Sequence, residues 1–199
     1  MKLNRLKDLD KDLKIFSARD HKYVLNPPLT EAEVTAFETA NGLRLPEEYR
    51  LYLTQIANGG AGPFYGLNAL GDNGDQTVDL SKDFEFDRSA TLLLAAVFEE
   101  EDADELYEIA WRMANQGIIY LAHEGCGMYS VLVIKGKEHG CVWYSDFSND
   151  VGLFPLVYPQ TGEPLGFFDW FEIWLDAALA CMENDTEELQ GYAEYIQQE

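Results

Sequence analysis

The sequence predicts a single α+β domain in which helices pack around an antiparallel or mixed sheet. Amphipathic helical patterns lie toward both ends of the chain, and β-rich segments follow one another between residues 118 and 146. With 199 residues, 47% of them hydrophobic, the chain can bury a core without disulfides. We expect a basic N-terminal arm with a short helix (1–28), the α+β domain (29–182) and an acidic helical tail (183–199).

The first sixteen residues predict a short amphipathic helix within the arm. Its apolar positions recur at helical spacing: Leu3, Leu6, Leu9, Leu13 and Phe16. Asn26-Pro27-Pro28 cannot continue a helix, because proline lacks an amide hydrogen and restricts the residue before it. The arm is therefore expected to end at these prolines.

Two helices are predicted next, joined by residues 42–45. Thr30 and Glu33 have the spacing of a capping box, and Gly42 supplies the stop. The inward face of the first helix is predicted to consist of Val34, Phe37 and Ala40. The second helix is predicted to begin with Pro46 at its first position and to bury a stripe of Tyr49, Tyr52, Leu53 and Ile56.

The second half of the chain predicts a helix, an antiparallel meander and a last helix. The helix follows an acidic run and ends before Gly117, with a buried face of Leu106, Ile109, Ala110 and Met113. The meander is predicted at residues 118–122, 129–134 and 141–146. The last helix is predicted to have Asp169 as its N-cap and a buried stripe of Phe171, Trp174, Leu175, Ala178, Leu179 and Met182.

A glycine-rich loop follows the second helix of the domain, at Gly59, Gly60 and Gly62. A phosphate-binding loop of the usual type needs a lysine after its glycines, or a glycine fingerprint between a strand and a helix. This loop follows a helix and has no lysine nearby. We therefore expect a helix stop and a tight corner that brings Phe64 and Tyr65 onto the core.

One cluster resembles a catalytic site. His123 and Cys126 are three residues apart, and an imidazole beside a thiol can activate it as a nucleophile. No third orienting residue accompanies them, so a small structural thiol is the favoured interpretation and no catalytic residue is predicted. The three cysteines have irregular spacing, which favours reduced thiols in a cytosol, and the sequence predicts no metal site and no cofactor.

Charge gives the strongest functional signal. The net charge is −22; residues 1–22 contribute +3 and residues 23–199 contribute −25. Such a surface repels nucleic acid and anionic lipid and accelerates association with basic partners. Neither a secretory signal nor an apolar run of about 18 residues is present, so we expect a cytoplasmic protein without membrane contact. Plain solubility, or adaptation to a salty environment, is the alternative explanation of the charge.

The acids in predicted loops are the candidate contacts for a basic partner. The densest run is Glu99, Glu100, Glu101, Asp102 and Asp104. The other candidates are Asp72, Asp75, Asp146 and Asp150. The alternative for the run is a solvated helix entry, where acids also favour the helix dipole.

Several blocks of the chain resemble the SUKH superfamily, which includes yeast cell-wall-assembly regulators and many bacterial immunity proteins. The most specific block is LTEAEVTAFETANGLRLPEEYRLYLTQIANGG, at residues 29–60, with its Leu-Pro-Glu-Glu-Tyr. The likeness continues through Ile119-Tyr120-Leu121-Ala122, Gly140-Cys141-Val142-Trp143 and Phe168-Asp169-Trp170-Phe171. It spans residues 29–180 and leaves out the arm and the tail.

This resemblance implies an α+β fold, no enzymatic activity and a role in binding another protein. In bacteria it implies a cytoplasmic immunity protein that neutralises a polymorphic toxin. Many such toxins, nucleases among them, have basic clefts, which an acidic inhibitor complements. The alternative is a regulatory or scaffolding module that binds an endogenous protein.

Overall fold

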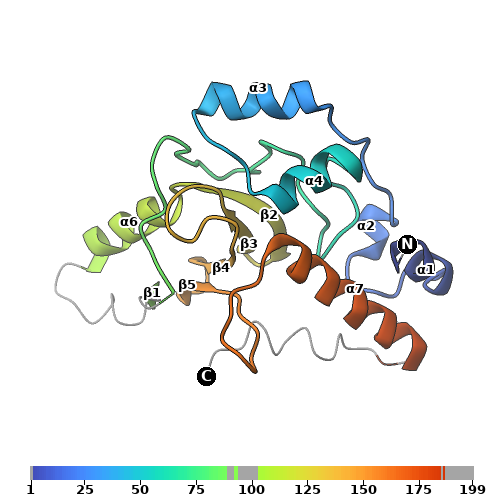
Figure 1. The fold of residues 1–199 in the computed structure, drawn as a ribbon. Helices are drawn as coiled ribbons and strands as arrows, with labels where there is room; N and C mark the ends of the chain where they lie inside the picture. Colours follow the sequence, from blue (N-terminus) through green and yellow to red (C-terminus); the bar gives the residue numbers. More distant parts are fainter. Residues whose placement is uncertain (1, 89–91, 94–102, 185, 187–199) are drawn as a thin grey trace.

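The computed structural model describes residues 2–88, 92–93, 103–184 and 186. Its centre is a five-stranded sheet in the order β1-β5-β4-β3-β2, and every pairing is antiparallel (Figure 1). The strands are β1 (Leu92–Leu93), β2 (Ile118–Gly125), β3 (Met128–Val133), β4 (Val142–Asp146) and β5 (Gly152–Pro155). The structure thus confirms the α+β class and the antiparallel meander.

The helices cover both faces of this sheet. Tyr52 of α4 and Trp170 of α7 belong to the apolar cluster on one face, whereas Ala110 and Ala114 of α6 belong to the cluster on the other. The described helices are α1 (Lys2–Leu9), α2 (Ala18–His21), α3 (Glu31–Asn41), α4 (Glu47–Gln55), α6 (Ala103–Ala114) and α7 (Phe167–Asn184). The sheet is therefore the middle layer, with α3 lying outside α4 (Figure 1).

Helix α3 begins with the predicted capping box. Thr30 Oγ1 accepts from the Glu33 amide at 3.2 Å, and the Glu33 carboxylate accepts from the Thr30 amide at 2.8 Å. The predicted inward face is partly wrong: Val34 is buried and Phe37 half-buried, but Ala40 is exposed. Glu38 is buried instead, because its carboxylate accepts the Leu45 amide at 3.0 Å.

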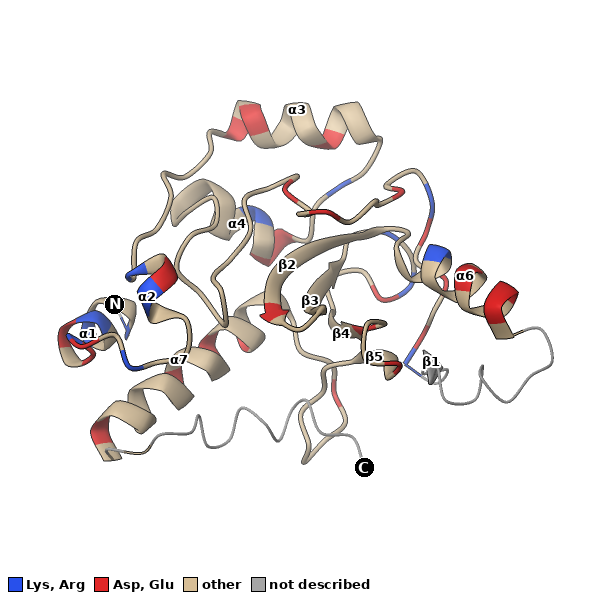
Figure 2. Cartoon of the chain, turned by 180° about the vertical axis from the view of Figure 1, so that it is seen from behind, with Lys and Arg blue, Asp and Glu red and all other residues tan. Residues whose placement is uncertain are grey.

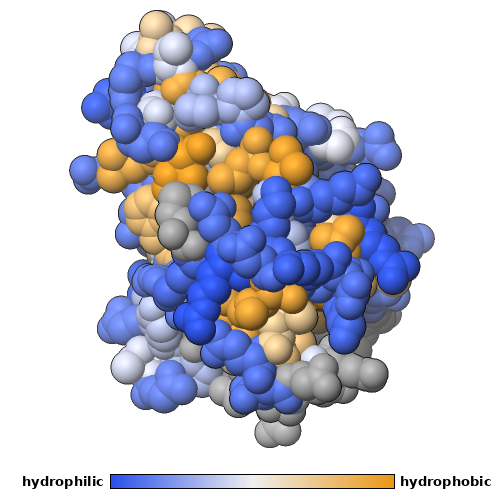
Figure 3. Space-filling model, turned by 90° about the vertical axis from the view of Figure 1, so that its right-hand side faces the viewer, coloured by the Kyte–Doolittle hydropathy of each residue, from blue (hydrophilic) through white to orange (hydrophobic). Residues whose placement is uncertain are grey.

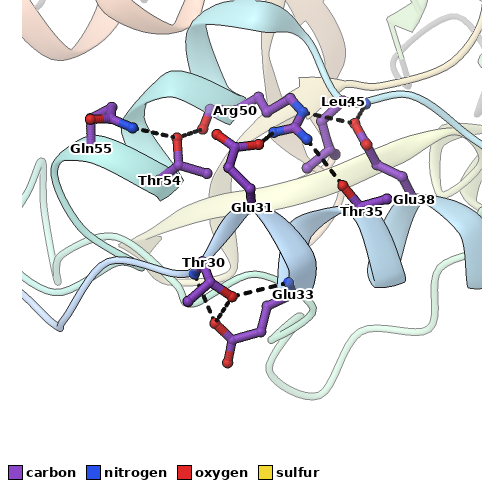
Figure 4. A network of polar contacts seen from close by, with 9 residues as sticks. All are labelled: Thr30, Glu31, Glu33, Thr35, Glu38, Leu45, Arg50, Thr54 and Gln55. Carbon is purple, nitrogen blue, oxygen red and sulfur yellow. Dashed lines mark hydrogen bonds and ion pairs between the residues drawn. The ribbon is translucent and has the colours of Figure 1, made fainter.

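An arginine of α4 joins the two helices (Figure 4). The Arg50 guanidinium pairs with Glu31 at 2.5 Å and lies 3.6 Å from the Glu38 carboxylate. It also donates to the Thr35 hydroxyl at 3.2 Å. These contacts hold α3 against α4, although Val34 is the one apolar side chain of α3 that is fully buried.

Helix α4 differs from the prediction at both ends. Pro46 is its N-cap, with φ −53° and ψ 139°, rather than its first helical residue. Tyr49, Tyr52 and Leu53 are buried as predicted. Ile56 is exposed because the chain has left the helix there, with φ −121° and ψ −66°.

The arm forms two short helices rather than one amphipathic helix over residues 1–16. Asp10 interrupts it: its buried carboxylate accepts the amides of Lys14 at 2.6 Å and Ile15 at 3.1 Å, and the Tyr23 hydroxyl at 2.6 Å. Leu3 and Leu6 are buried as predicted, Leu13 is half-buried, and Leu9 and Phe16 are exposed. The predicted helical spacing of buried apolar residues therefore does not extend beyond α1.

The arm packs on α7. One apolar cluster joins the arm to α7 from Trp174 onward, including Leu179. Its arm residues are Leu3, Leu6, Ile15, Ala18 and Tyr23. Ion pairs at its edge join Lys2 to Glu172 and Asp176, and Arg5 to Glu183. The predicted stripe on α7 is confirmed at Trp174, Leu175, Ala178 and Leu179, while Phe171 and Met182 are half-buried.

Two further helix predictions need correction. The helix α7 begins at Phe167, so Asp169 is not its N-cap but lies in its first turn and accepts the Gly166 amide at 3.4 Å. On α6, Ala110 is buried, Ile109 and Met113 are half-buried, and Leu106 is exposed. This helix lies against the sheet mainly through Ala110 and Ala114.

The glycine-rich loop is a corner, as predicted. Gly59 and Gly60 have φ of +80° and +101°. A Cβ on Gly60 would lie 2.6 Å from the Val24 carbonyl oxygen, since this backbone forms bridges with Leu25 and Leu67. Only glycine tolerates both the positive φ and this approach. The corner does not carry Tyr65 into the core, however: its side chain is 46% exposed.

Candidate protein-binding surface

The predicted acidic contacts have different positions. Asp72, Asp75, Asp104 and Asp150 are exposed. Glu99, Glu100, Glu101 and Asp102 lie outside the described residues. Within the described part of the chain, none of the four exposed aspartates forms an ion pair.

Asp146 differs from the expectation of an exposed contact, because it is buried, with 3% of its surface exposed. Its Oδ1 accepts the Asn149 amide at 3.0 Å and the Asn149 side-chain Nδ2 at 2.8 Å. These hydrogen bonds close the turn after β4. A buried carboxylate engaged in this way supports its own loop and is not available to a partner.

Sequence patterns missed a second buried acid, Glu124, at the end of β2. It is 6% exposed, and the Ser130 hydroxyl donates to its Oε1 at 2.5 Å. Burial raises the pKa of Glu124 to about 8; the Ser130 hydrogen bond opposes this shift, and the charge of Asp146 adds to it. Burial and these two acids also raise the pKa of Tyr144.

A β-bulge explains why Glu124 points inward. The register between β2 and β3 shifts between Tyr120 and Ala122, so Leu121 and Ala122 both lie in the apolar cluster under α4 and α7. Strict alternation from Leu121 would place His123 on that face. The extra residue moves Glu124 there instead and turns His123 to the opposite face.

A row of aromatic rings lies where the arm, the glycine corner and the β2–β3 hairpin meet. The Phe16 ring lies edge-on to Tyr65 at 5.4 Å, Tyr65 stacks on His123 at 5.4 Å, and His123 contacts Tyr129 at 4.9 Å. Tyr120 continues the row at 4.8 Å from Tyr129. Phe16 is 51% exposed, so the row begins in solvent and ends in the core.

Acidic loops flank the hairpin end of this row. The Gln76 side chain donates to the Tyr129 hydroxyl at 3.4 Å, which places the loop of Asp72 and Asp75 beside the ring. The Asn149 side chain donates to the Cys126 carbonyl at 3.1 Å, which brings Asp150 near the hairpin. We call these residues the hairpin-end surface: Phe16, Tyr65, His123, Tyr129, Asp72, Asp75 and Asp150.

This geometry does not assemble a thiol–imidazole pair. The His123 ring contacts Tyr65 on one side and Tyr129 on the other, and Cys126 is exposed at the hairpin turn with φ +48°. No hydrogen bond joins the two side chains in the part of the chain described. Asp72 accepts the Gly74 amide at 3.0 Å, as in a simple turn, and the described residues contain no group of three ligands for a metal.

Charge is divided unevenly over the fold (Figure 2). Lysines and arginines gather on α1 and α2, whereas acids are spread over α3, α6, α7 and the loops. Two of the basic residues, Lys2 and Arg5, are paired with acids of α7. No described helix has the length and apolarity needed to cross a lipid bilayer.

The structure is an antiparallel sheet between helices, and some acids and aromatics are exposed on its surface. The chain's match to a known protein family supports a protein-interaction module. The chain belongs to the SMI1 / KNR4 family (SUKH-1), whose model matches residues 28–177. Members of this family are generally non-catalytic immunity or regulatory proteins. No curated protein and no solved structure matches the chain.

Proposed function

We propose that this protein is a non-catalytic immunity protein of the bacterial cytoplasm that binds and neutralises a cognate polymorphic toxin with a basic surface, such as a nuclease. The observation that supports this most is the set of exposed aspartates at 72, 75, 104 and 150, which lack ion pairs within the described part of the chain. They add to a net charge of −22 on a fold whose family members bind proteins.

The physical argument is electrostatic. Acids that form no ion pair with the described residues attract the lysines and arginines of an approaching protein, and they lose little on binding because no such ion pair must break. Glu99, Glu100, Glu101 and Asp102 belong to the same proposal as a second contact region. Inhibition is then stoichiometric, because the protein occupies the toxin rather than turning over a substrate.

The test is affinity capture with the tagged full chain in lysate of its native cells, washed at low and then at high salt. A single captured protein that dissociates with salt, and that is toxic when expressed without this chain, supports the proposal. Capture of a non-toxic cellular protein supports the regulatory alternative instead. A Cys126→Ala variant should bind and protect as well as the wild type; thiol-dependent turnover would contradict the non-catalytic assignment.

A further inference from the structure

We infer that the aromatic row is the anchor of this interface and that it receives an arginine side chain of the basic partner. The inference deepens the proposed function and rests on it. It specifies that the guanidinium lies across the exposed part of Tyr65 and is directed toward the carboxylates of the hairpin-end surface.

The exposure of the row supports this inference. Phe16 and Tyr65 touch each other and are each about half exposed, although nearby apolar clusters bury other aromatics completely. On the side where the arm lies, apolar patches interrupt an otherwise polar surface (Figure 3). Large exposed aromatics that are held by their neighbours are typical of binding hot spots, because they lose little conformational freedom on association.

The backbone around the row is strained. Three non-glycine residues with positive φ lie next to it: Ser17 follows Phe16, Phe64 precedes Tyr65, and Cys126 belongs to the hairpin turn, with φ of +56°, +52° and +48°. Gly125 lies directly beneath Tyr65, since a Cβ there would be 3.6 Å from its Cε2. Such strain persists where it holds side chains in a functional position.

Charge complementarity determines the kind of partner. Near its buried end the row contacts Gln76, which follows Asp75, through Tyr129, and the adjacent hairpin turn contacts Asn149, which precedes Asp150. The exposed end of the row, at Phe16, adjoins the basic arm. A cation is therefore favoured at the end formed by Tyr65, His123 and Tyr129. Arginine fits better than lysine, because its planar guanidinium stacks on a ring while donating to carboxylates.

The experiment compares two probes of equal charge, an octapeptide of arginine and an octapeptide of lysine, titrated into the full chain at physiological salt by calorimetry. We expect the arginine peptide to bind roughly two- to five-fold more tightly, the gain of one exposed cation–π contact. In ¹⁵N spectra it should shift the amides near Tyr65 and Tyr129.

Variants of the protein test whether the aromatic row causes the preference for the arginine peptide. Tyr65→Leu keeps apolar bulk without a ring and should abolish the arginine preference, whereas Tyr65→Phe should retain it. Leu51→Ala is the matched control, because Leu51 is equally exposed at 46% but lies on α4. An Asp72→Asn/Asp75→Asn pair should weaken both peptides. If Tyr65→Leu fails to fold, loss of the preference in Phe16→Leu tests the same row.

Equal affinities for the two peptides would overturn this inference, and so would an arginine preference that survives in Tyr65→Leu. Neither result would contradict the proposed function, because that function is tested by the capture of a toxin. Conversely, an arginine preference at Tyr65 together with a non-toxic cellular partner would refute the immunity role and keep the anchor.

Discussion

Replacing Glu124 with glutamine should stabilise this protein at neutral and alkaline pH. The carboxyl group is buried beneath the hairpin with the Ser130 hydroxyl donating to it, and a glutamine amide oxygen can accept the same bond. Its pKa of about 8 exceeds the value of 4.5 expected in an unfolded chain. Glutamine has nearly the same shape and never ionises, so it removes the cost of charging this site.

The direction and the size of this change in stability follow from the linkage between proton binding and folding. The pKa of Glu124 is higher in the folded state than in the unfolded chain. Its contribution to folding stability is therefore fully present below pH 4.5 and is lost as pH rises to about 8. At about 1.4 kcal/mol per pH unit, the loss is about 3 kcal/mol at pH 7 and about 5 kcal/mol above pH 8. The Glu124→Gln variant should be more stable than the wild type by these amounts.

Urea unfolding of both proteins at a series of pH values, followed by tryptophan fluorescence, measures this difference. The buried Trp143, Trp170 and Trp174 report the loss of the core. Glu108→Gln, at an exposed position of α6, is the control and should show no such pH-dependent gain. A Glu124→Gln difference that stays constant from pH 5 to pH 9 would refute the reasoning.

Three further predictions concern the arm, the corner and the interface. Asp10→Ala should destabilise the fold by about 2–4 kcal/mol in urea unfolding, because it removes an acceptor shared by two amides and a tyrosine hydroxyl; Asp12→Ala, at an exposed position, should change little. Gly60→Ala should destabilise by about 3 kcal/mol or more, since its Cβ would collide with backbone, and Gly74→Ala, with nothing within 4 Å, by only about 1 kcal/mol. Charge reversal across Glu99–Asp102 should slow association with the partner roughly ten-fold and flatten its salt dependence in stopped-flow measurements; unchanged kinetics would exclude that run from the interface.

Local patterns predicted much of the fold. The capping box of Thr30 and Glu33 involves residues three apart, so its geometry needs no other part of the chain. The antiparallel meander likewise followed from alternation and turn residues. Two predictions failed for different reasons. The Asp10 carboxylate breaks the first helical pattern. On α3 the inward face consists of Val34, Phe37 and Glu38 at i, i+3 and i+4, so Ala40 at i+6 lies off that face.

The candidate site was predicted less completely. Charge density identified Asp72, Asp75 and Asp150, which are exposed, but it also selected Asp146, which is buried. A loop acid that faces solvent and one that closes its own turn have the same sequence signature. The difference depends on where the turn after β4 places the side chain, and this is a property of the folded loop.

By itself, the sequence determined the α+β class, the capping box of α3, the glycine corner and the acidic composition, because each depends on composition or on neighbours within a few residues. Only the tertiary structure decided which side chains meet. The rings of Phe16, Tyr65, His123 and Tyr129 come from the arm, the corner and two strands. One bulged residue in β2 determines that His123 joins this row while Glu124 turns into the core, and such a change of register depends on pairing between strands.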